Sequence, residues 1–229
     1  QQLLLIEKLD GTLEDYLFSD DFDEKVLLSC LFQISFSLHY LQKHYKFTHN
    51  DLHINNVMYS ETTTKYLYYK FNNQYFKIPT YGKIFKIIDF GRSIFTYNNK
   101  IYMNDVFTKN SEAWGQFYYP PQVQFLTKPP EDIPNIEPNY NFDLCRLSMT
   151  IIEEIDKSKL SENMFNFLND MCIDKFNENY CEMEDNFSLY INISKNAINS
   201  LPEDILNKTI FKQYKVIKKN FPSKLYYKI

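Results

Sequence analysis

The chain has 229 residues, a net charge of −4 at neutral pH and a pI near 5.6, and 44% of its residues are hydrophobic. This size and composition predict one sizeable domain with a real hydrophobic core. The sequence shows no signal-peptide pattern and no apolar run long enough to span a membrane, and its four cysteines are too scattered to form a metal site, so we expect reduced thiols inside a cell.

The first predicted elements are a short strand and two helices. Residues 3–6 are a leucine and isoleucine run that predicts a strand. Thr12 followed by Asp15 is the pattern of a helix N-cap with an acid three residues on, so a helix should begin there. A long amphipathic helix should follow, because leucine and isoleucine recur at alternating steps of four and three at positions 27, 31, 34, 38 and 41.

Two short apolar segments, residues 57–59 and 84–88, predict strands on either side of an insertion. The insertion, residues 62–83, carries two aromatic-rich stretches around Asn72-Asn73. Alternating strands around such a dipeptide predict a β-hairpin with a two-residue turn.

Polar motifs lie next to the two predicted strands. Residues 49–56 read H-N-D-L-H-I-N-N before the first strand, and residues 89–91 read D-F-G after the second. The first motif matches the catalytic loop of protein kinases except at Asn50, where the family carries Arg, and the second matches their metal-binding turn. The chain therefore resembles the C-terminal lobe of a eukaryotic-type protein kinase. The resemblance implies an α+β fold, mainly helical, with a short hinge strand and the 62–83 hairpin as an insertion.

The resemblance also implies phosphoryl transfer that depends on ATP and Mg²⁺. Asp51 would accept the proton of the attacking hydroxyl, and Asn56 and Asp89 would hold Mg²⁺. This reaction asks the protein for positioning and charge stabilisation. Hard oxygen donors suit magnesium, which needs few of them because phosphates and water supply the rest. His53 stands where most such kinases carry a Lys, and it would assist at the transferred phosphate.

The same resemblance divides the chain. Residues 1–11 would be the last strand of the N-lobe and the hinge, and residues 12–229 the C-lobe. The 229 residues contain no Gly-rich loop and no strand with the ATP-binding Lys. We therefore expect the N-lobe to be largely absent and this segment to have little activity alone.

The hinge would supply the nucleotide contacts. Ile6 would be the gatekeeper, and the backbone of Glu7 and Leu9 would bind adenine. Asp10 or Glu14 could reach a ribose hydroxyl, although a solvated helix start explains these two acids equally well.

Two departures from the family affect regulation and substrate docking. Asn50 replaces an Arg that often pairs with a phosphorylated residue, so we do not expect control by phosphorylation of the activation segment. That segment, residues 89–122, contains no A-P-E motif. His53 and the hairpin resemble haspin-like kinases, whereas the D-F-G-R sequence is closer to giant-virus kinases. A composition rich in Asn, Lys, Ile, Tyr and Phe agrees with a large DNA virus.

Further along the chain, residues 142–155 predict a helix that Asp143 helps to open. By the resemblance, Asp143 would accept hydrogen bonds from the catalytic-loop backbone, and His49 and Gly91 would also support the site. A plain acid that favours the helix dipole is the alternative for Asp143. Helices are also predicted at residues 164–171 and from Leu201.

The C-terminal residues 211–228 carry six lysines interleaved with aromatic residues. Such an array could contact nucleic acid. Because the whole chain is acidic, we interpret it as a solvated helix and tail, and we expect neither nucleic acid nor a membrane as a partner.

The sequence thus predicts a kinase that transfers the ATP γ-phosphate to a Ser or Thr hydroxyl of a protein substrate. The alternatives are a small-molecule phosphotransferase, which shares the D-L-H-x-x-N pattern, and a pseudokinase that acts as a binding module. We expect the protein in the cytoplasm or nucleus of its host or source cell, or packaged in a virion.

Overall fold

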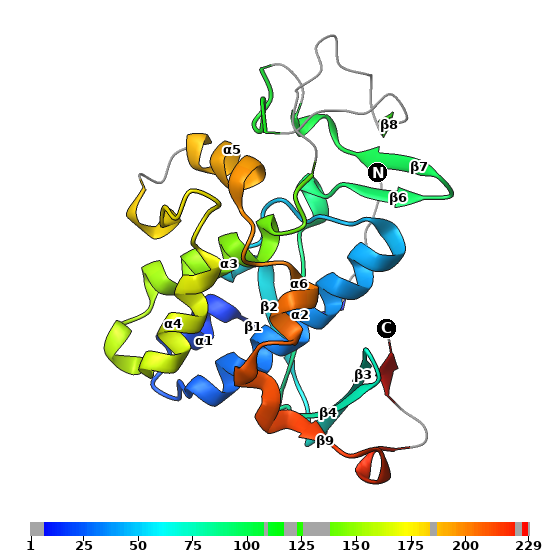
Figure 1. The fold of residues 1–229 in the computed structure, drawn as a ribbon, viewed down its shortest axis with the longest axis vertical. Coiled ribbons are helices and arrows are strands. Elements are labelled where there is room, and N and C mark those ends of the chain that lie inside the picture. The colour runs from blue at the N-terminus through cyan, green and yellow to red at the C-terminus, as the bar shows by residue number, and fades with distance from the viewer. Residues whose placement is uncertain are drawn as a thin grey trace.

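The computed structural model describes residues 7–107, 110–116, 123–125, 138–183, 187–222 and 226–228. It is an α+β structure of helices and small sheets (Figure 1). The helices are α1 (Leu13–Phe18), α2 (Glu24–Tyr45), α3 (Phe142–Glu154), α4 (Glu162–Met171), α5 (Phe187–Asn196) and α6 (Pro202–Leu206). Within these ranges no helix has the length and apolar character needed to cross a bilayer.

The strands form three small sheets. They are β1 (Gly11–Thr12), β2 (Val57–Glu61), β3 (Tyr66–Phe71), β4 (Gln74–Pro79), β5 (Lys83–Ile87), β6 (Phe95–Tyr97), β7 (Lys100–Met103), β8 (Val123–Phe125), β9 (Lys215–Val216) and β10 (Tyr227–Lys228). The strand orders are β1-β2-β5, β10-β3-β4-β9 and β6-β7-β8. The strand predicted at residues 3–6 lies outside the described residues.

The predicted helix start at Thr12 and the long helix are confirmed. Thr12 and Asp15 cap α1 reciprocally, with Asp15 N donating to Thr12 Oγ1 at 3.0 Å and Thr12 N donating to Asp15 Oδ2 at 2.9 Å. Helix α2 runs through the middle of the molecule and buries the leucine and isoleucine face on which its prediction rested, except at the half-buried Leu41 (Figure 1). The α2 helix therefore lies at the centre of the fold, where it contacts α6 and strands β4, β5 and β6.

The predicted hairpin is also confirmed. Strands β3 and β4 pair from Tyr66 opposite Pro79 to Phe71 opposite Gln74. The turn residues Asn72 and Asn73 have φ values of 45° and 59°, which a two-residue hairpin of this hand requires. The inner face of the hairpin packs on α2, where the buried Phe32 ring lies 5.0 Å from the Phe76 ring and 5.1 Å from the Phe211 ring.

The interpretation of residues 211–228 as a solvated helix and tail is wrong. Strand β9 pairs antiparallel with β4, and strand β10 pairs parallel with β3. In the described part of this segment the only helical turns are 3-10 turns. The hairpin edges carry unpaired backbone groups, and the C-terminal strands satisfy them. A local pattern of lysines and aromatics does not reveal a pairing partner so far away in the sequence.

Part of the predicted activation segment forms a second hairpin that the sequence analysis did not predict. Strands β6 and β7 pair around Asn98 and Asn99, whose φ values are 48° and 60°. This is the same turn chemistry as in the first hairpin. Strand β8 then pairs parallel with β7.

His39 lies where α2 meets the first hairpin. Its side chain is 7% exposed, and its ring packs edge-on against Phe71 with centroids 5.2 Å apart. Burial lowers the pKa of His39 below its ordinary value of 6.5; Lys43 and His44 lower it further, and the Glu203 carboxylate opposes them. The unfolded chain therefore binds more protons than the folded chain as the pH falls through about 6.5.

We predict that the free energy of unfolding decreases as the pH falls from about 7.5 to about 5.5. The decrease should be smaller in His39→Leu, because this variant has no imidazole to protonate at the contact. Urea unfolding at several pH values measures it, with His44→Leu at an exposed position of the same helix as the matched control. Identical pH slopes in wild type and His39→Leu would contradict the prediction.

Candidate active site

A buried carboxylate holds the loop that carries the first motif. Asp143, in the first turn of α3, is fully buried. Its Oδ2 accepts a hydrogen bond from His49 N and its Oδ1 accepts one from Asn50 N, both at 2.9 Å. These are the hydrogen bonds that the resemblance implied for Asp143. Burial raises the pKa of Asp143, and the two backbone donors favour its charged form.

The same loop is tied to the Asp89 turn. His49 Nε2 donates to the carbonyl of Ile88 at 2.8 Å, since a carbonyl can only accept. Asn50 Nδ2 donates to the carbonyl of Arg92, also at 2.8 Å. The residues on both sides of Asp89 are therefore fixed by the two residues whose backbone Asp143 holds.

The β2–β5 ladder brings the second half of the motif to the same place. Val57 lies opposite Ile87, and beyond this pair Ile88 N donates to the carbonyl of Asn56 at 3.0 Å. Asn56 and Asp89 thus lie at the same end of two paired strands. The strands expected on the two sides of the hairpin are confirmed, and they deliver polar residues from their ends.

Two residues of the site have left-handed backbone conformations. Asn50 has a φ of 66° and Asp89 a φ of 58°. Asparagine and aspartate tolerate this region better than most residues, and such conformations cluster at functional sites. Asp89 Oδ1 accepts a hydrogen bond from Gly91 N at 3.3 Å, so the Asp89 side chain caps the short 3-10 turn that contains Gly91.

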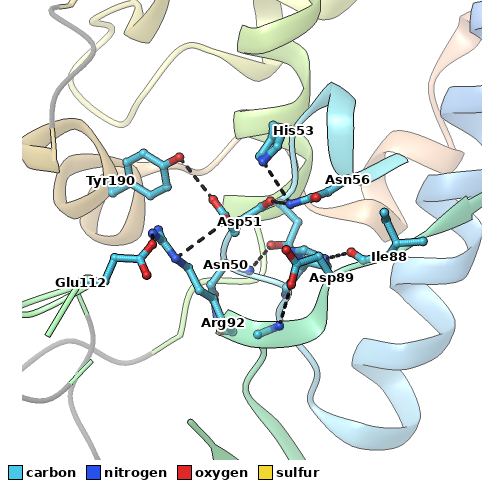
Figure 2. Close-up of polar contacts among 12 residues, drawn as sticks. Asn50, Asp51, His53, Asn56, Ile88, Asp89, Arg92, Glu112 and Tyr190 are labelled. Atoms are coloured by element: carbon cyan, nitrogen blue, oxygen red, sulfur yellow. Dashed lines mark hydrogen bonds and ion pairs between the residues drawn. The ribbon is translucent and has the colours of Figure 1, made fainter. Parts of the chain in front are cut away.

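The carboxamide of Asn56 is oriented by two partners. Its Nδ2 donates to the carbonyl of Asp51 at 2.9 Å and lies 3.0 Å from His53 Nε2 (Figure 2). His53 Nδ1 also lies 3.3 Å from Asn55 N. A neutral imidazole has one acceptor nitrogen, and we assign it to Nε2 because that contact is shorter. Burial lowers the pKa of His53, which favours this neutral form. Nε2 of His53, the residue predicted to assist at the transferred phosphate, therefore faces Asn56.

This orientation determines which Asn56 atom is available. Because Nδ2 makes both contacts within the loop, Oδ1 points the other way, and among the hydrogen bonds of the described residues it accepts none. Asn56 Oδ1 and the Asp89 carboxylate are hard oxygen donors of the kind that Mg²⁺ prefers, and magnesium accepts few protein ligands when phosphates are present. The described residues contain no cluster of three or more His, Cys, Asp or Glu that could hold a metal ion. The donor set thus fits a metal shared with a phosphate ligand.

The Asp51 carboxylate has two partners from distant parts of the chain. The Tyr190 hydroxyl donates to Oδ1 at 3.3 Å, and Arg92 Nε lies 3.7 Å from Oδ2 (Figure 2). Arg92 also forms an ion pair with Glu112. The sequence analysis did not identify Tyr190, because no local pattern links a tyrosine of α5 to a loop 139 residues earlier.

Tyr190 is held firmly in this position. Its ring lies 5.2 Å from the Arg146 guanidinium and 5.6 Å from that of Arg92, and 5.8 Å from the Phe142 ring. Burial raises the pKa of Tyr190, so its hydroxyl remains a donor at neutral pH. The hydrogen bond from Tyr190 to Asp51 is therefore made by a side chain whose position is fixed by packing.

Of the residues predicted for the hinge, Glu7 lies beside the β1–β2–β5 sheet. Ile6 lies outside the described residues. The exposed Glu7 carboxylate pairs with Lys86, and this hydrogen bond lowers the pKa of Glu7. Leu9 is half-buried.

The two acids considered for the ribose have partners within the chain. Asp10 Oδ2 accepts from Glu61 N at 2.8 Å, so this carboxylate supports strand β2. Glu14, in the first turn of α1, accepts from Asn55 Nδ2 at 3.1 Å and so contacts the candidate catalytic loop. The structure thus brings Glu14, but not the Asp10 carboxylate, into contact with that loop.

Comparisons with known proteins give one partial relative, and no known family profile matches the chain. A protein of Dictyostelium discoideum, named as a probable serine/threonine-protein kinase, is 38% identical over 91 residues. The match covers 36% of this chain and 8% of that protein, so the chain spans less than a tenth of its relative. This finding suggests a relationship to protein kinases and gives no support to a haspin-like or viral subgroup.

We predict that Asp143→Ala lowers the free energy of unfolding by about 2–6 kcal/mol, because each of two buried amides left without an acceptor costs about 1–3 kcal/mol. Asp143→Asn retains one acceptor oxygen and should lose less. Urea unfolding measures both, with Asp204→Ala in the exposed first turn of α6 as the control. Equal losses in Asp143→Ala and Asp204→Ala would show that the two hydrogen bonds contribute little.

Proposed function

We propose that this chain carries the C-lobe site of a protein kinase that transfers the ATP γ-phosphate to a Ser or Thr hydroxyl of a protein. One observation carries the proposal. Asp143 holds the loop that carries Asp51 and Asn56. The side chains of His49 and Asn50 hold the turn that carries Asp89. The two carboxylates and the carboxamide therefore lie in one site. The partial match to a kinase adds support.

In this proposal each side chain has a separate task. Asp51 accepts the proton of the substrate hydroxyl, because it is a half-exposed carboxylate on a rigid loop. Asn56 Oδ1 and Asp89 hold Mg²⁺. When bound, the ion neutralises charge on the phosphate oxygens. His53 acts through Asn56, since its Nε2 fixes the carboxamide with Oδ1 turned away from the loop.

The nucleotide contacts and the finer classification are part of the same proposal. The backbone of Glu7 and Leu9 would bind adenine, with Ile6 as the gatekeeper and Asp10 or Glu14 as the ribose contact; of these two acids, Glu14 contacts the candidate catalytic loop. Kinship with haspin-like or giant-virus kinases rests on the resemblance of His53, the hairpin and the D-F-G-R sequence alone.

A second candidate function is supported by a specific contact. Tyr190 and Arg92 engage both carboxylate oxygens of Asp51 in this structure. A pseudokinase that serves as a binding module has no need of a free base, and this arrangement suits it.

The Asp51→Asn variant separates these candidates, and it should be made in the complete reading frame that contains this chain. We predict Mg²⁺- and ATP-dependent label on protein acceptors such as casein or histone, reduced about 10²–10⁴-fold in the variant with ATP binding retained. Asp204→Asn is the control for loss of a carboxylate elsewhere. Transfer only to choline, sugar or aminoglycoside acceptors would indicate a small-molecule enzyme. Absence of transfer to any acceptor would contradict the catalytic proposal and favour the binding module.

Replacement of His53 tests its action on Asn56. We predict that His53→Ala raises the Mg²⁺ concentration needed for half-maximal activity about fivefold, the equivalent of one hydrogen bond. His53→Gln should retain most of the affinity, because its amide oxygen can accept from Asn56 Nδ2. His44→Gln is the matched control. A fall in kcat with unchanged Mg²⁺ dependence would instead support a direct contact between His53 and phosphate.

Removal of one hydroxyl tests Tyr190. We predict that Tyr190→Phe lowers kcat about tenfold and leaves the KM for ATP unchanged, because the variant loses a hydrogen bond that orients the charged base. Tyr97→Phe, at an exposed position of β6, is the control. A rise in kcat would show that Tyr190 blocks the acceptor position.

A further inference from the structure

The basic residues of this acidic chain are strongly segregated. Residues 62–83 and 205–229 together contain eleven lysines and no aspartate or glutamate. The rest of the chain has 14 basic and 29 acidic residues. The expectation that nucleic acid is not a partner rested on the net charge of the whole chain, which conceals this separation.

The fold brings the two lysine-rich segments together in one sheet. The first segment supplies β3 and β4, and the second supplies β9 and β10 at their edges. In Figure 1 this sheet lies at the opposite end of the molecule from β6 and β7. The positive charge is therefore concentrated on one part of the molecule, away from the candidate active site.

The two faces of this sheet have different character. Leu67, Tyr69 and Phe71 of β3 are buried in the core. The alternate residues point outward, and cross-strand partners share a face. Tyr68 pairs with Lys77, and Lys70 pairs with Tyr75 on one side and with Lys228 on the other. We call the outward set of Tyr66, Tyr68, Lys70, Tyr75, Lys77 and Tyr226 the basic-aromatic face.

Lysines and rings alternate closely on this face. Lys77 Nζ lies 3.8 Å from the centre of the Tyr66 ring, and Lys70 Nζ lies 5.6 Å from that of Tyr75. The residues Tyr66 and Tyr226 are 41% and 38% exposed, respectively. Two partly exposed aromatic side chains thus lie on a face that also carries positive charges.

A cavity opens between these rings. Its volume is about 540 Å³, and it is lined by Tyr66, Tyr68, Tyr226 and Tyr227 together with Pro222. Ligand pockets commonly measure about 300–1,000 Å³. The walls are mostly aromatic, and lysines lie nearby, so a planar ring joined to an anionic group would match both features.

We propose that the basic-aromatic face binds single-stranded nucleic acid. Bases stack on exposed aromatic rings, and lysines contact the phosphates, which is the usual chemistry of such sites. A duplex keeps its bases stacked and offers nothing to the tyrosine cavity. An acidic peptide would match the charge but lacks flat rings. The proposal is independent of the phosphotransferase function.

The test is fluorescence anisotropy with a labelled 20-residue oligothymidylate at several salt concentrations. We expect binding at low salt that weakens as salt increases. Lys70→Gln with Lys77→Gln should reduce the salt slope by about 0.7 for each lost phosphate contact. Tyr66→Ala or Tyr226→Ala should weaken binding by about tenfold or more, since stacking on one ring contributes about 1–3 kcal/mol.

Matched controls are available outside the two lysine-rich segments. Lys157 and Lys159 are exposed and also lie over aromatic rings, at 5.3 Å from Phe165 and 5.9 Å from Phe22. Lys157→Gln with Lys159→Gln should leave binding unchanged, and Asp51→Asn should also bind normally. Circular dichroism establishes that each variant is folded.

Several results would overturn the proposal. The first is that the protein does not bind the oligothymidylate at about 50 mM salt. The second is that the Lys157/Lys159 control loses as much affinity as the Lys70/Lys77 variant. The third is that the tyrosine variants bind with the affinity of the wild type. Equal competition by duplex DNA, polyglutamate or anionic vesicles would reduce the face to a general anion-binding surface. None of these outcomes depends on phosphate transfer, so failure here and failure of the proposed enzyme are distinguishable.

Discussion

The two hydrogen bonds to the buried Asp143 carboxylate are the constraint on which the site depends. A buried charge is costly unless it is well paired, and here two backbone amides pair it. The amides belong to His49 and Asn50, whose side chains in turn hold Ile88 and Arg92. One carboxylate at the start of α3 therefore fixes, through a single loop, the turn that presents Asp89.

With the backbone held in this way, a few polar contacts determine how the side chains of the site are oriented. The Asp51 carbonyl and His53 together determine which way the Asn56 carboxamide faces, and Tyr190 with Arg92 determines how the Asp51 carboxylate is held. These contacts join the loop to α5 and to the segment after the D-F-G turn. The site is thus assembled from four stretches of sequence, which are the loop 49–56, the turn at residues 88–92, the start of α3, and α5. The lysine-rich sheet packs on the same core, which includes residues of α2, β3 and β4.

Elements with a local cause could be predicted from the sequence. The α2 helix follows from its leucine spacing, and the first hairpin follows from Asn72-Asn73 between alternating strands. The second hairpin has the same Asn-Asn signal at 98–99, but the expectation of an activation segment obscured it. The pairing of β9 and β10 and the contact of Tyr190 with Asp51 could not be predicted, because each joins residues far apart in sequence through packing that no local pattern encodes.

The central claim is that Asn56 Oδ1 and Asp89 share a divalent metal with a nucleotide phosphate. Paramagnetic broadening by Mn²⁺-ATP of the NMR signals from isotope-labelled protein tests it most directly. The account predicts that the Asn56 side-chain amide and the Gly91 backbone amide broaden first, and that Asp89→Asn abolishes the effect. Broadening centred elsewhere, or unchanged in Asp89→Asn, would contradict it.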